Sequence, residues 1–175
     1  MLYDTTTDKL ISLVNTRLLS LCINNNPYYF TEPYHTLWAI QFYFGFRFAE
    51  VAASSAWTFN SPDSIIVPLL KNQAHRKLSL LPSDFNNILS ALEAHEFLYY
   101  CNPTTNDRLF RSLFHCDLYL SSGKRLTSHL FRHLYIKQLY ANIPSIPLTS
   151  QTIHETSNTN TSGYVFSVIN SSIRL

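Results

Sequence analysis

Apolar residues in the first part of the chain recur at intervals of three and four, the spacing of an amphipathic helix. A first helix is predicted between the polar residues 5–7, which offer N-caps, and the breaker at 24–27, with apolar positions Leu10, Val14, Leu18 and Leu21. A second helix is predicted from Pro33 to Gly45, with one face formed by Leu37, Ile40 and Phe44. A third, short helix is expected over residues 46–54.

The pattern then changes to that of strands. Residues 64–70 and 77–80 are apolar or alternating, and the polar residues between them predict the turn of a β-hairpin. Pro68 cannot donate a ladder hydrogen bond, so its strand should lie at an edge or begin there. Helical spacing returns after Ser83 and again over residues 107–120 and 127–140, whereas the Ser-, Thr- and Asn-rich stretch from 150 onward has the weakest pattern.

These elements predict a mostly helical α+β fold with one small antiparallel β-sheet. The chain has 175 residues, of which 46% are hydrophobic, so we expect a single domain over residues 1–175 with one substantial core. Three widely spaced cysteines, Cys22, Cys101 and Cys116, predict neither a disulfide framework nor a zinc site. No leader-like or membrane-length apolar segment is present, which favours a cytoplasmic protein without membrane association.

Positive charge is concentrated in the middle of the chain. Residues 71–141 hold nine basic and five acidic groups, against three and five in residues 1–70 and one of each in residues 142–175. The net charge is only +2. A basic section can bind nucleic acid or can simply be a solvated face, so the choice depends on motifs.

Four blocks of candidate chemistry follow one another along the chain. They are GFRFAEV at 45–51, KNQAHRKLSL at 71–80, LTSHLFRH at 126–133, and IHE at 153–155 with Thr159, Thr161 and Tyr164 after it. In order and spacing they resemble the motif blocks of the tyrosine recombinases, or phage integrases, and the third block is the most specific. The resemblance extends from about residue 5 to residue 166.

The resemblance implies an enzyme that breaks and rejoins DNA by transesterification, through a 3′-phosphotyrosine intermediate. Tyr164 is then the nucleophile, and Arg47 and Arg132 bind the phosphate. Attack on a phosphodiester builds negative charge on the non-bridging oxygens, which arginine forks complement. A free tyrosine has a pKa of about 10, so the attacking hydroxyl needs help to lose its proton.

The remaining catalytic residues are also assigned from the resemblance. His129 assists proton removal and His154 donates a hydrogen bond to the phosphate, although these two roles could be exchanged. Lys71 protonates the leaving 5′ oxygen, with Arg76 or Lys77 as alternatives for this role.

Two further residues are expected to support the site. Glu50 follows Arg47 at a spacing that also suits a simple ion pair across a helix turn. His133 is more typical of a buried, hydrogen-bonded histidine than of a catalytic one. The chain departs from the family pattern where Ile153 replaces the usual glycine and where Gly163 directly precedes Tyr164, a position at which glycine loosens a helix.

The resemblance also implies the partners. They are double-stranded DNA, further copies of the chain in a homo-multimer on paired DNA sites, and DNA-bending accessory proteins, in a bacterial or phage-encoded, nucleoid-associated setting typical of mobile genetic elements. No metal or other cofactor is expected. Most family members carry an N-terminal DNA-clamping, or core-binding, domain, and we expect it to be absent here. Two alternatives are a type IB topoisomerase-like enzyme and a catalytically inactive DNA-binding homologue.

Overall fold

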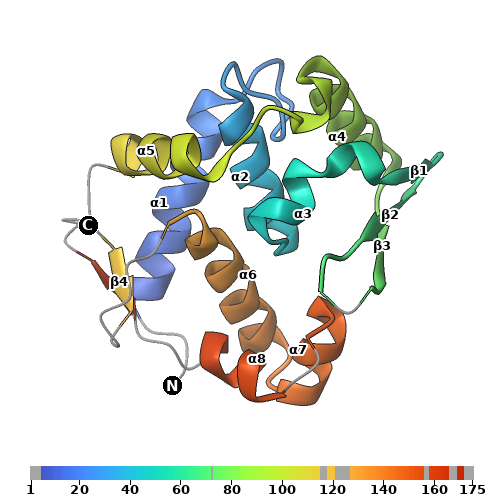
Figure 1. The fold of residues 1–175 in the computed structure, drawn as a ribbon. Helices are drawn as coiled ribbons and strands as arrows, with labels where there is room; N and C mark the ends of the chain where they lie inside the picture. The colour runs from blue at the N-terminus through green and yellow to red at the C-terminus, as the bar shows by residue number, and fades with distance from the viewer. Residues whose placement is uncertain are drawn as a thin grey trace.

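The computed structural model describes residues 5–71, 73–114, 118–120, 127–155, 158–165 and 169–171. Two central helices, residues 33–44 and 129–142, are surrounded by the other helices, and a small three-stranded sheet lies at one side (Figure 1). The elements are α1 (Thr5–Leu21), α2 (Pro33–Phe44), α3 (Phe48–Ala52), η1 (Ser54–Ala56), β1 (Thr58–Asn60), β2 (Ser64–Pro68), β3 (His75–Ser79), α4 (Pro82–Ala94), η2 (Glu96–Leu98), α5 (Pro103–Phe114), β4 (Leu118–Leu120), α6 (His129–Asn142), α7 (Ile146–Ile153), α8 (Asn158–Val165) and β5 (Ile169–Ser171). The predicted mostly helical α+β fold is confirmed.

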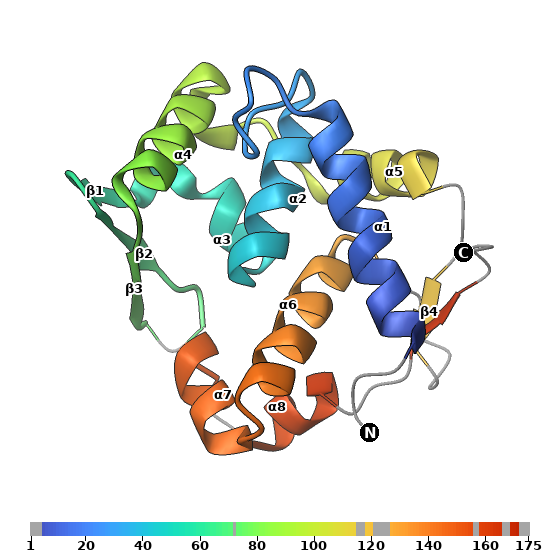
Figure 2. The ribbon, with the colours of Figure 1, turned by 180° about the vertical axis from the view of Figure 1, so that it is seen from behind.

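Helix α2 lies at the centre of the core and packs against α6. It is apolar nearly all round, as expected of a helix covered on every side. Trp38 of α2 and Phe131 of α6 are both fully buried, with ring centroids 5.8 Å apart. Helix α1 lies behind this pair in Figure 1 and in front of it in Figure 2. Of its predicted apolar face, Leu10, Val14 and Leu18 are buried, whereas Leu21, at the end of the helix, is 41% exposed.

The turn between α2 and α3 brings the first motif block into the core. Gly45 ends α2 in the left-handed region, at φ 78°, as predicted for a C-cap. Phe46 is then fully buried, and Arg47 takes an extended N-cap conformation. Helix α3 therefore begins at Phe48, two residues later than predicted.

The predicted hairpin is strands β2 and β3, and it belongs to an antiparallel sheet of order β1-β2-β3. The expectation that Pro68 marks an edge strand or the start of one is wrong, because β2 is the central strand and Pro68 is its last residue. Pro68 pairs only with His75, since the β1 pairing ends at Ile66. The missing N–H therefore removes no bond to β1.

The helix predicted over residues 107–120 is wrong at both ends. Helix α5 begins earlier, at Pro103, where the side chain of Asn102 accepts a hydrogen bond of 3.0 Å from the N–H of Thr105. Strand β4 then forms within the predicted helix by pairing with β5. This second sheet, and the helices α7 and α8 of the weakly patterned tail, were not predicted.

The membrane, cysteine and metal predictions can be compared with the described residues. Within the described ranges, no helix has both the length and the apolar character needed to cross a bilayer. Cys22 and Cys101 are free thiols, while Cys116 lies outside the described residues. No group of three or more potential metal-ligating side chains occurs in the described part of the chain.

Candidate active site

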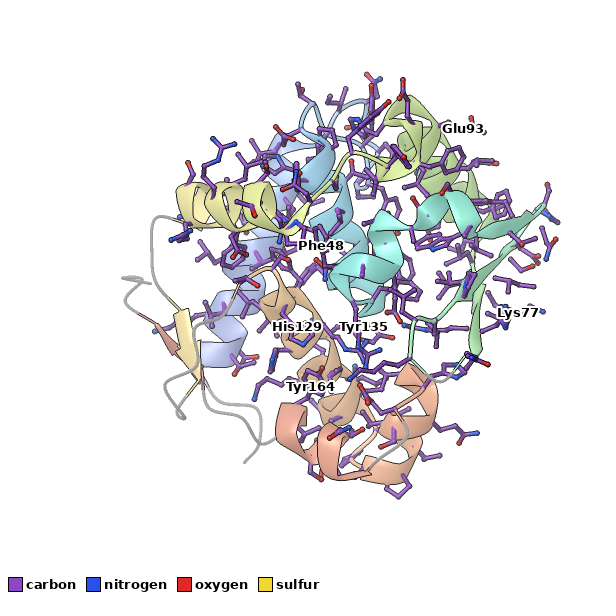
Figure 3. All side chains as sticks on the ribbon, viewed as in Figure 1. Phe48, Lys77, Glu93, His129, Tyr135 and Tyr164 are labelled. Atoms are coloured by element: carbon purple, nitrogen blue, oxygen red, sulfur yellow. The ribbon has the colours of Figure 1, made fainter. Side chains whose placement is uncertain are left out.

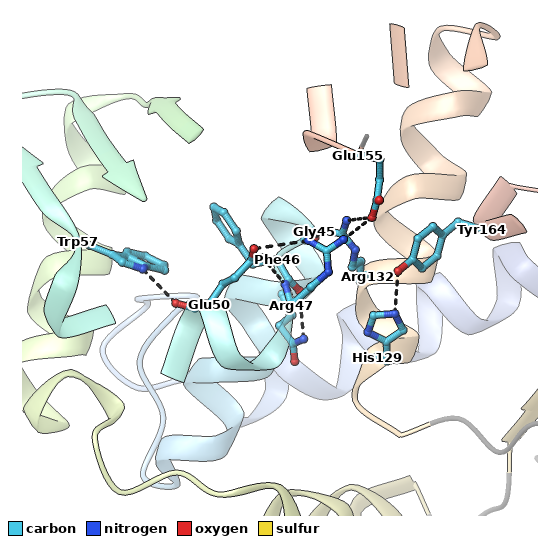
Figure 4. A network of polar contacts seen from close by, with 10 residues as sticks. Gly45, Phe46, Arg47, Glu50, Trp57, His129, Arg132, Glu155 and Tyr164 are labelled. Atoms are coloured by element: carbon cyan, nitrogen blue, oxygen red, sulfur yellow. Dashed lines mark hydrogen bonds and ion pairs between the residues drawn. The ribbon is translucent and has the colours of Figure 1, made fainter. Parts of the chain in front are cut away.

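Two arginines from distant parts of the sequence meet at one carboxylate (Figure 4). Arg47 is the N-cap of α3, and Arg132 lies in the first turn of α6. Nη2 of Arg132 donates to Oε1 of Glu155 at 2.9 Å, and Nη2 of Arg47 donates to the same oxygen. The side chains of Arg132 and Glu155 are 1% and 3% exposed, so this is a nearly buried three-residue ion cluster.

Glu50 holds Arg47 from the other side. Its Oε1 accepts a hydrogen bond of 2.8 Å from the N–H of Arg47, and its Oε2 lies 3.5 Å from Nη1 of Arg47. The carbonyl of Glu50 accepts from Nε1 of Trp57 at 3.1 Å. The ion pair across the helix turn is therefore present, and because Glu50 is buried it also fixes the backbone and guanidinium of Arg47.

Arg132 is fixed by the end of α2. Its Nη1 donates to the carbonyl of Gly45, which the left-handed cap presents to α6. Its Nε is buried and has no hydrogen-bond acceptor among the described residues. The guanidinium therefore retains a donor for a further acceptor.

Tyr164 and His129 lie beside the arginines (Figure 4). The hydroxyl of Tyr164 and Nε2 of His129 are hydrogen-bonded at 3.0 Å. The guanidinium carbon of Arg132 lies 5.4 Å from the centroid of the Tyr164 ring. His133 is buried, with its ring centroid 4.8 Å from that of Tyr164 and 5.2 Å from that of His129. Histidine, tyrosine and arginine side chains of the third and fourth blocks thus share one site.

The start of α6 and the end of α8 are fixed by buried polar contacts. Asn106 of α5 donates to the hydroxyl of Ser128 at 2.8 Å, directly before His129, and accepts from Nε1 of Trp38 at 2.7 Å. Lys137 of α6 donates from Nζ to the carbonyl of Val165, next to Tyr164, at 3.1 Å. The positions of His129 and Tyr164 therefore depend on the core rather than on a surface loop.

Gly163 lies inside α8, and replacing it is expected to stabilise the protein. A Cβ built on Gly163 meets no atom within 4 Å among the described residues. Glycine in a helix costs about 0.5–1 kcal/mol relative to alanine. Gly163→Ala should therefore raise Tm by roughly 1–4 °C in a thermal melt. A lowered Tm would show that α8 needs the conformational freedom of glycine.

Lys71 is exposed in the loop between β2 and β3, and no hydrogen bond or ion pair connects it to the site residues within the described part. Lys77 is also exposed and lies well away from His129 and Tyr164 in Figure 3.

Arg76, the other alternative for the general acid, points into the protein. Its guanidinium lies 4.5 Å from the centroid of Phe46, and its Nη2 donates to the hydroxyl of Tyr135 at 3.3 Å. Burial lowers the pKa of Arg76, and the positive charge of Arg132 lowers it further, while Tyr135 and Glu50 oppose this. Arg76 therefore adds a buried positive charge next to Phe46 and Tyr135.

His154 lies at the edge of the site. It caps α7 in the left-handed region, at φ 56°. Partial burial lowers the pKa of His154, Arg76 lowers it further, and Glu50 opposes this. His154 directly precedes Glu155, so the backbone holds it next to the charged cluster.

The residue that sequence reasoning missed is Glu155. It belongs to the fourth block, yet it received no role. The available signal was its isolation, because Glu155 is the one acidic residue after position 141, and it directly follows a candidate site histidine. A cavity of about 340 Å³ opens beside Arg47 and His129, and Asp107 and Thr127 also line it.

Comparison with protein-family profiles and with the sequences of characterised proteins gave no match. Solved structures do resemble the chain. The XerH site-specific recombinase bound to difH substrate, in its pre-cleavage complex, has a TM-score of 0.61 and 14% identity, over 90% of this chain and 48% of that one. Its post-cleavage complex on a palindromic difH substrate gives the same values. The XerA recombinase has a TM-score of 0.58 and 16% identity, over 93% of this chain and 58% of that one.

The chain therefore spans about half the length of these neighbours, which are tyrosine recombinases. Its helices and its three-stranded sheet match their catalytic domain. At this level of sequence identity the likeness concerns the fold: the chain has the fold of a tyrosine recombinase catalytic domain.

Proposed function

We propose that this chain is a site-specific DNA recombinase domain that cuts and rejoins duplex DNA through a 3′-phosphotyrosine intermediate, as part of a homo-multimer on paired sites. The hydrogen bond of 3.0 Å between Tyr164 and His129, beside the Arg47–Arg132 pair, carries this proposal. A phenol held by a base next to two guanidinium groups supplies the nucleophile, the proton acceptor and the charge stabilisation that phosphoryl transfer requires. The likeness to XerH, solved in complex with its difH substrate, supports DNA as the partner.

In the proposed reaction the phenolic oxygen of Tyr164 attacks the phosphorus of the scissile phosphodiester. His129 accepts the phenolic proton when Nε2 is its unprotonated nitrogen. A bond forms between the tyrosine oxygen and phosphorus, and the bond to the 5′ oxygen of the next nucleotide breaks. A second 5′-hydroxyl can then attack the phosphotyrosine and release the tyrosine, because the new bond retains the reactivity of a phosphodiester.

The other site residues receive supporting roles in this proposal. Arg47 and Arg132 bind the non-bridging oxygens, and His154 donates a hydrogen bond to the phosphate. The leaving 5′ oxygen takes a proton from a general acid, for which we propose the exposed Lys71, which follows strand β2. Glu50 positions Arg47 through its hydrogen bond to the N–H of Arg47, and His133 positions Tyr164 through the contact between their rings.

Substituting the tyrosine tests the reaction class. Wild type and Tyr164→Phe are incubated with nicked duplex DNA that carries a candidate site, and the products are separated under denaturing conditions. We expect a covalent protein–DNA adduct with wild type and none with Tyr164→Phe, because the variant lacks the attacking oxygen. The variant should bind DNA as wild type does, since the ring remains. An adduct formed equally by Tyr164→Phe would assign the nucleophile to another residue.

Binding to duplex DNA should depend steeply on salt. Among the described residues of the positive section, four basic side chains are exposed: Lys71, Lys77, Arg108 and Arg111. The two lysines belong to the hairpin and the two arginines to α5, and these elements lie on opposite sides of the molecule (Figure 1). If each contacts a phosphate, the logarithm of the binding constant falls against that of the salt concentration with a slope of about −4. A slope near zero in a fluorescence-anisotropy titration would argue against phosphate contacts.

A second candidate function is DNA binding without cleavage. The observation that favours it is the Glu155 carboxylate, which already occupies both arginines. A permanently neutralised arginine pair would leave the attacking tyrosine without charge stabilisation. The same adduct assay separates the two functions, because this alternative predicts salt-dependent binding with no adduct from wild type.

A further inference from the structure

Glu155 makes the contacts that a substrate phosphate would make. One of its oxygens, Oε1, accepts hydrogen bonds from both Arg47 and Arg132, and its side chain is almost fully buried. We propose that Glu155 is an internal stand-in for the scissile phosphate: it holds the two arginines together in the free protein and must be displaced for DNA to bind productively. This proposal rests on the proposed function only in taking a DNA phosphate as the natural competitor.

The donors around Glu155 fit a larger anion better than they fit one carboxylate oxygen. Arginine forks bind carboxylates and phosphates through the same parallel N–H groups, so the two ligands exclude each other. Nε of Arg132 is buried without an acceptor in the described part of the chain, although both of its Nη atoms are bonded. A tetrahedral anion has further oxygens for that donor, whereas Glu155 contacts the pair through Oε1.

The backbone of Glu155 is fixed, so the exchange is a movement of its side chain. Helix α7 ends in a left-handed cap at His154, and the N–H of Glu155 donates to the carbonyl of Ser150 at 3.0 Å. This cap directs the side chain of Glu155 back towards the arginines. The bonds of Arg47 to Glu50 and of Arg132 to Gly45 do not involve Glu155, so they can hold both guanidinium groups in place after it leaves.

Competition of this kind weakens binding by a predictable factor. The apparent affinity of a ligand is reduced by the fraction of molecules in which its site is available. If Glu155 leaves the arginine pair in about one molecule in ten, phosphate or sulfate binds about tenfold more weakly than to a variant without the carboxylate. A residue with a purely structural role would have the opposite effect, because its loss would disorder the arginines.

The experiment measures sulfate binding, which requires neither DNA nor catalysis. Wild type, Glu155→Gln and the control Glu93→Gln are titrated with sodium sulfate at constant ionic strength, and Tm is followed. Glu93 is exposed on α4, far from His129 and Tyr164, and the control removes the same charge (Figure 3). We expect the sulfate concentration for half-maximal stabilisation to be about tenfold lower for Glu155→Gln than for the other two proteins.

Two results would overturn the proposal. One is an equal sulfate response in all three proteins. The other is a Glu155→Gln variant that fails to fold and that sulfate does not restore, since Glu155 would then be a structural anion. The double variant Arg47→Gln with Glu155→Gln locates the effect, because it should lose the gain in affinity. A gain that persists there would assign the sulfate to another site and would also contradict the proposal.

The adduct assay separates this proposal from the proposed function. Glu155→Gln should form adduct about tenfold faster than wild type at DNA concentrations well below saturation. Tighter sulfate binding by Glu155→Gln, with no adduct from any protein, would support the competition and reject the cleavage reaction. Adduct from wild type, with unchanged sulfate binding and an unchanged or slower rate in Glu155→Gln, would support cleavage and reject the competition.

Discussion

Arg132→Ala is expected to slow adduct formation by about 100- to 1,000-fold, the usual cost of removing one donor to a developing oxyanion. The guanidinium of Arg132 is buried, bonds to Gly45 and Glu155, and lies 5.4 Å from the Tyr164 ring, so no other described cation can take its place without rearrangement. Breaking a buried ion pair also costs about 3–5 kcal/mol of folding free energy. Single-turnover rates on nicked DNA, measured together with Tm, report both effects.

Arg132→Lys distinguishes the chemical effect from the structural one. Lysine retains the positive charge but cannot bond Gly45 and Glu155 through a planar fork. We expect a folded protein whose adduct rate is still reduced by at least about tenfold. Lys9→Ala, an exposed position on α1, is the control and should react as wild type does. A wild-type rate for Arg132→Lys would show that charge alone is needed.

The parts of the fold that could be predicted from the sequence are those set by local spacing and by caps. Helix α1 follows its apolar stripe, and α2 stops at Gly45 because the left-handed cap favours glycine. Strands β1, β4 and β5 could not be predicted, since each has three residues and forms only by pairing with another segment. Strand β4 pairs with residues about fifty positions later in the chain, which a local pattern cannot reveal.

The candidate site was predicted as a set of residues but not as a network. The four motif blocks predicted Arg47, His129, Arg132 and Tyr164 as site residues, and the structure places these four side chains together. Glu155 escaped prediction because its importance comes from geometry: a single carboxylate matters when the end of α7 directs it between two arginines from other helices. The position of Lys71 relative to the cluster depends on an exposed loop, whose conformation local sequence does not fix.

Gly45→Ala is expected to destabilise the protein strongly, because Gly45 packs against the Tyr135 ring and its carbonyl holds Arg132 at the site. An added Cβ would overlap the Tyr135 ring, 2.7 Å from Cε1, and the φ of 78° costs an alanine about 1–2 kcal/mol. Overpacking adds about 1–3 kcal/mol, so Tm should fall by roughly 4–20 °C. The carbonyl of Gly45 also holds Arg132, so adduct formation should slow in the protein that stays folded. Gly163→Ala is the matched control, and an equal Tm for both variants would show that α6 can move away from α2 at little cost.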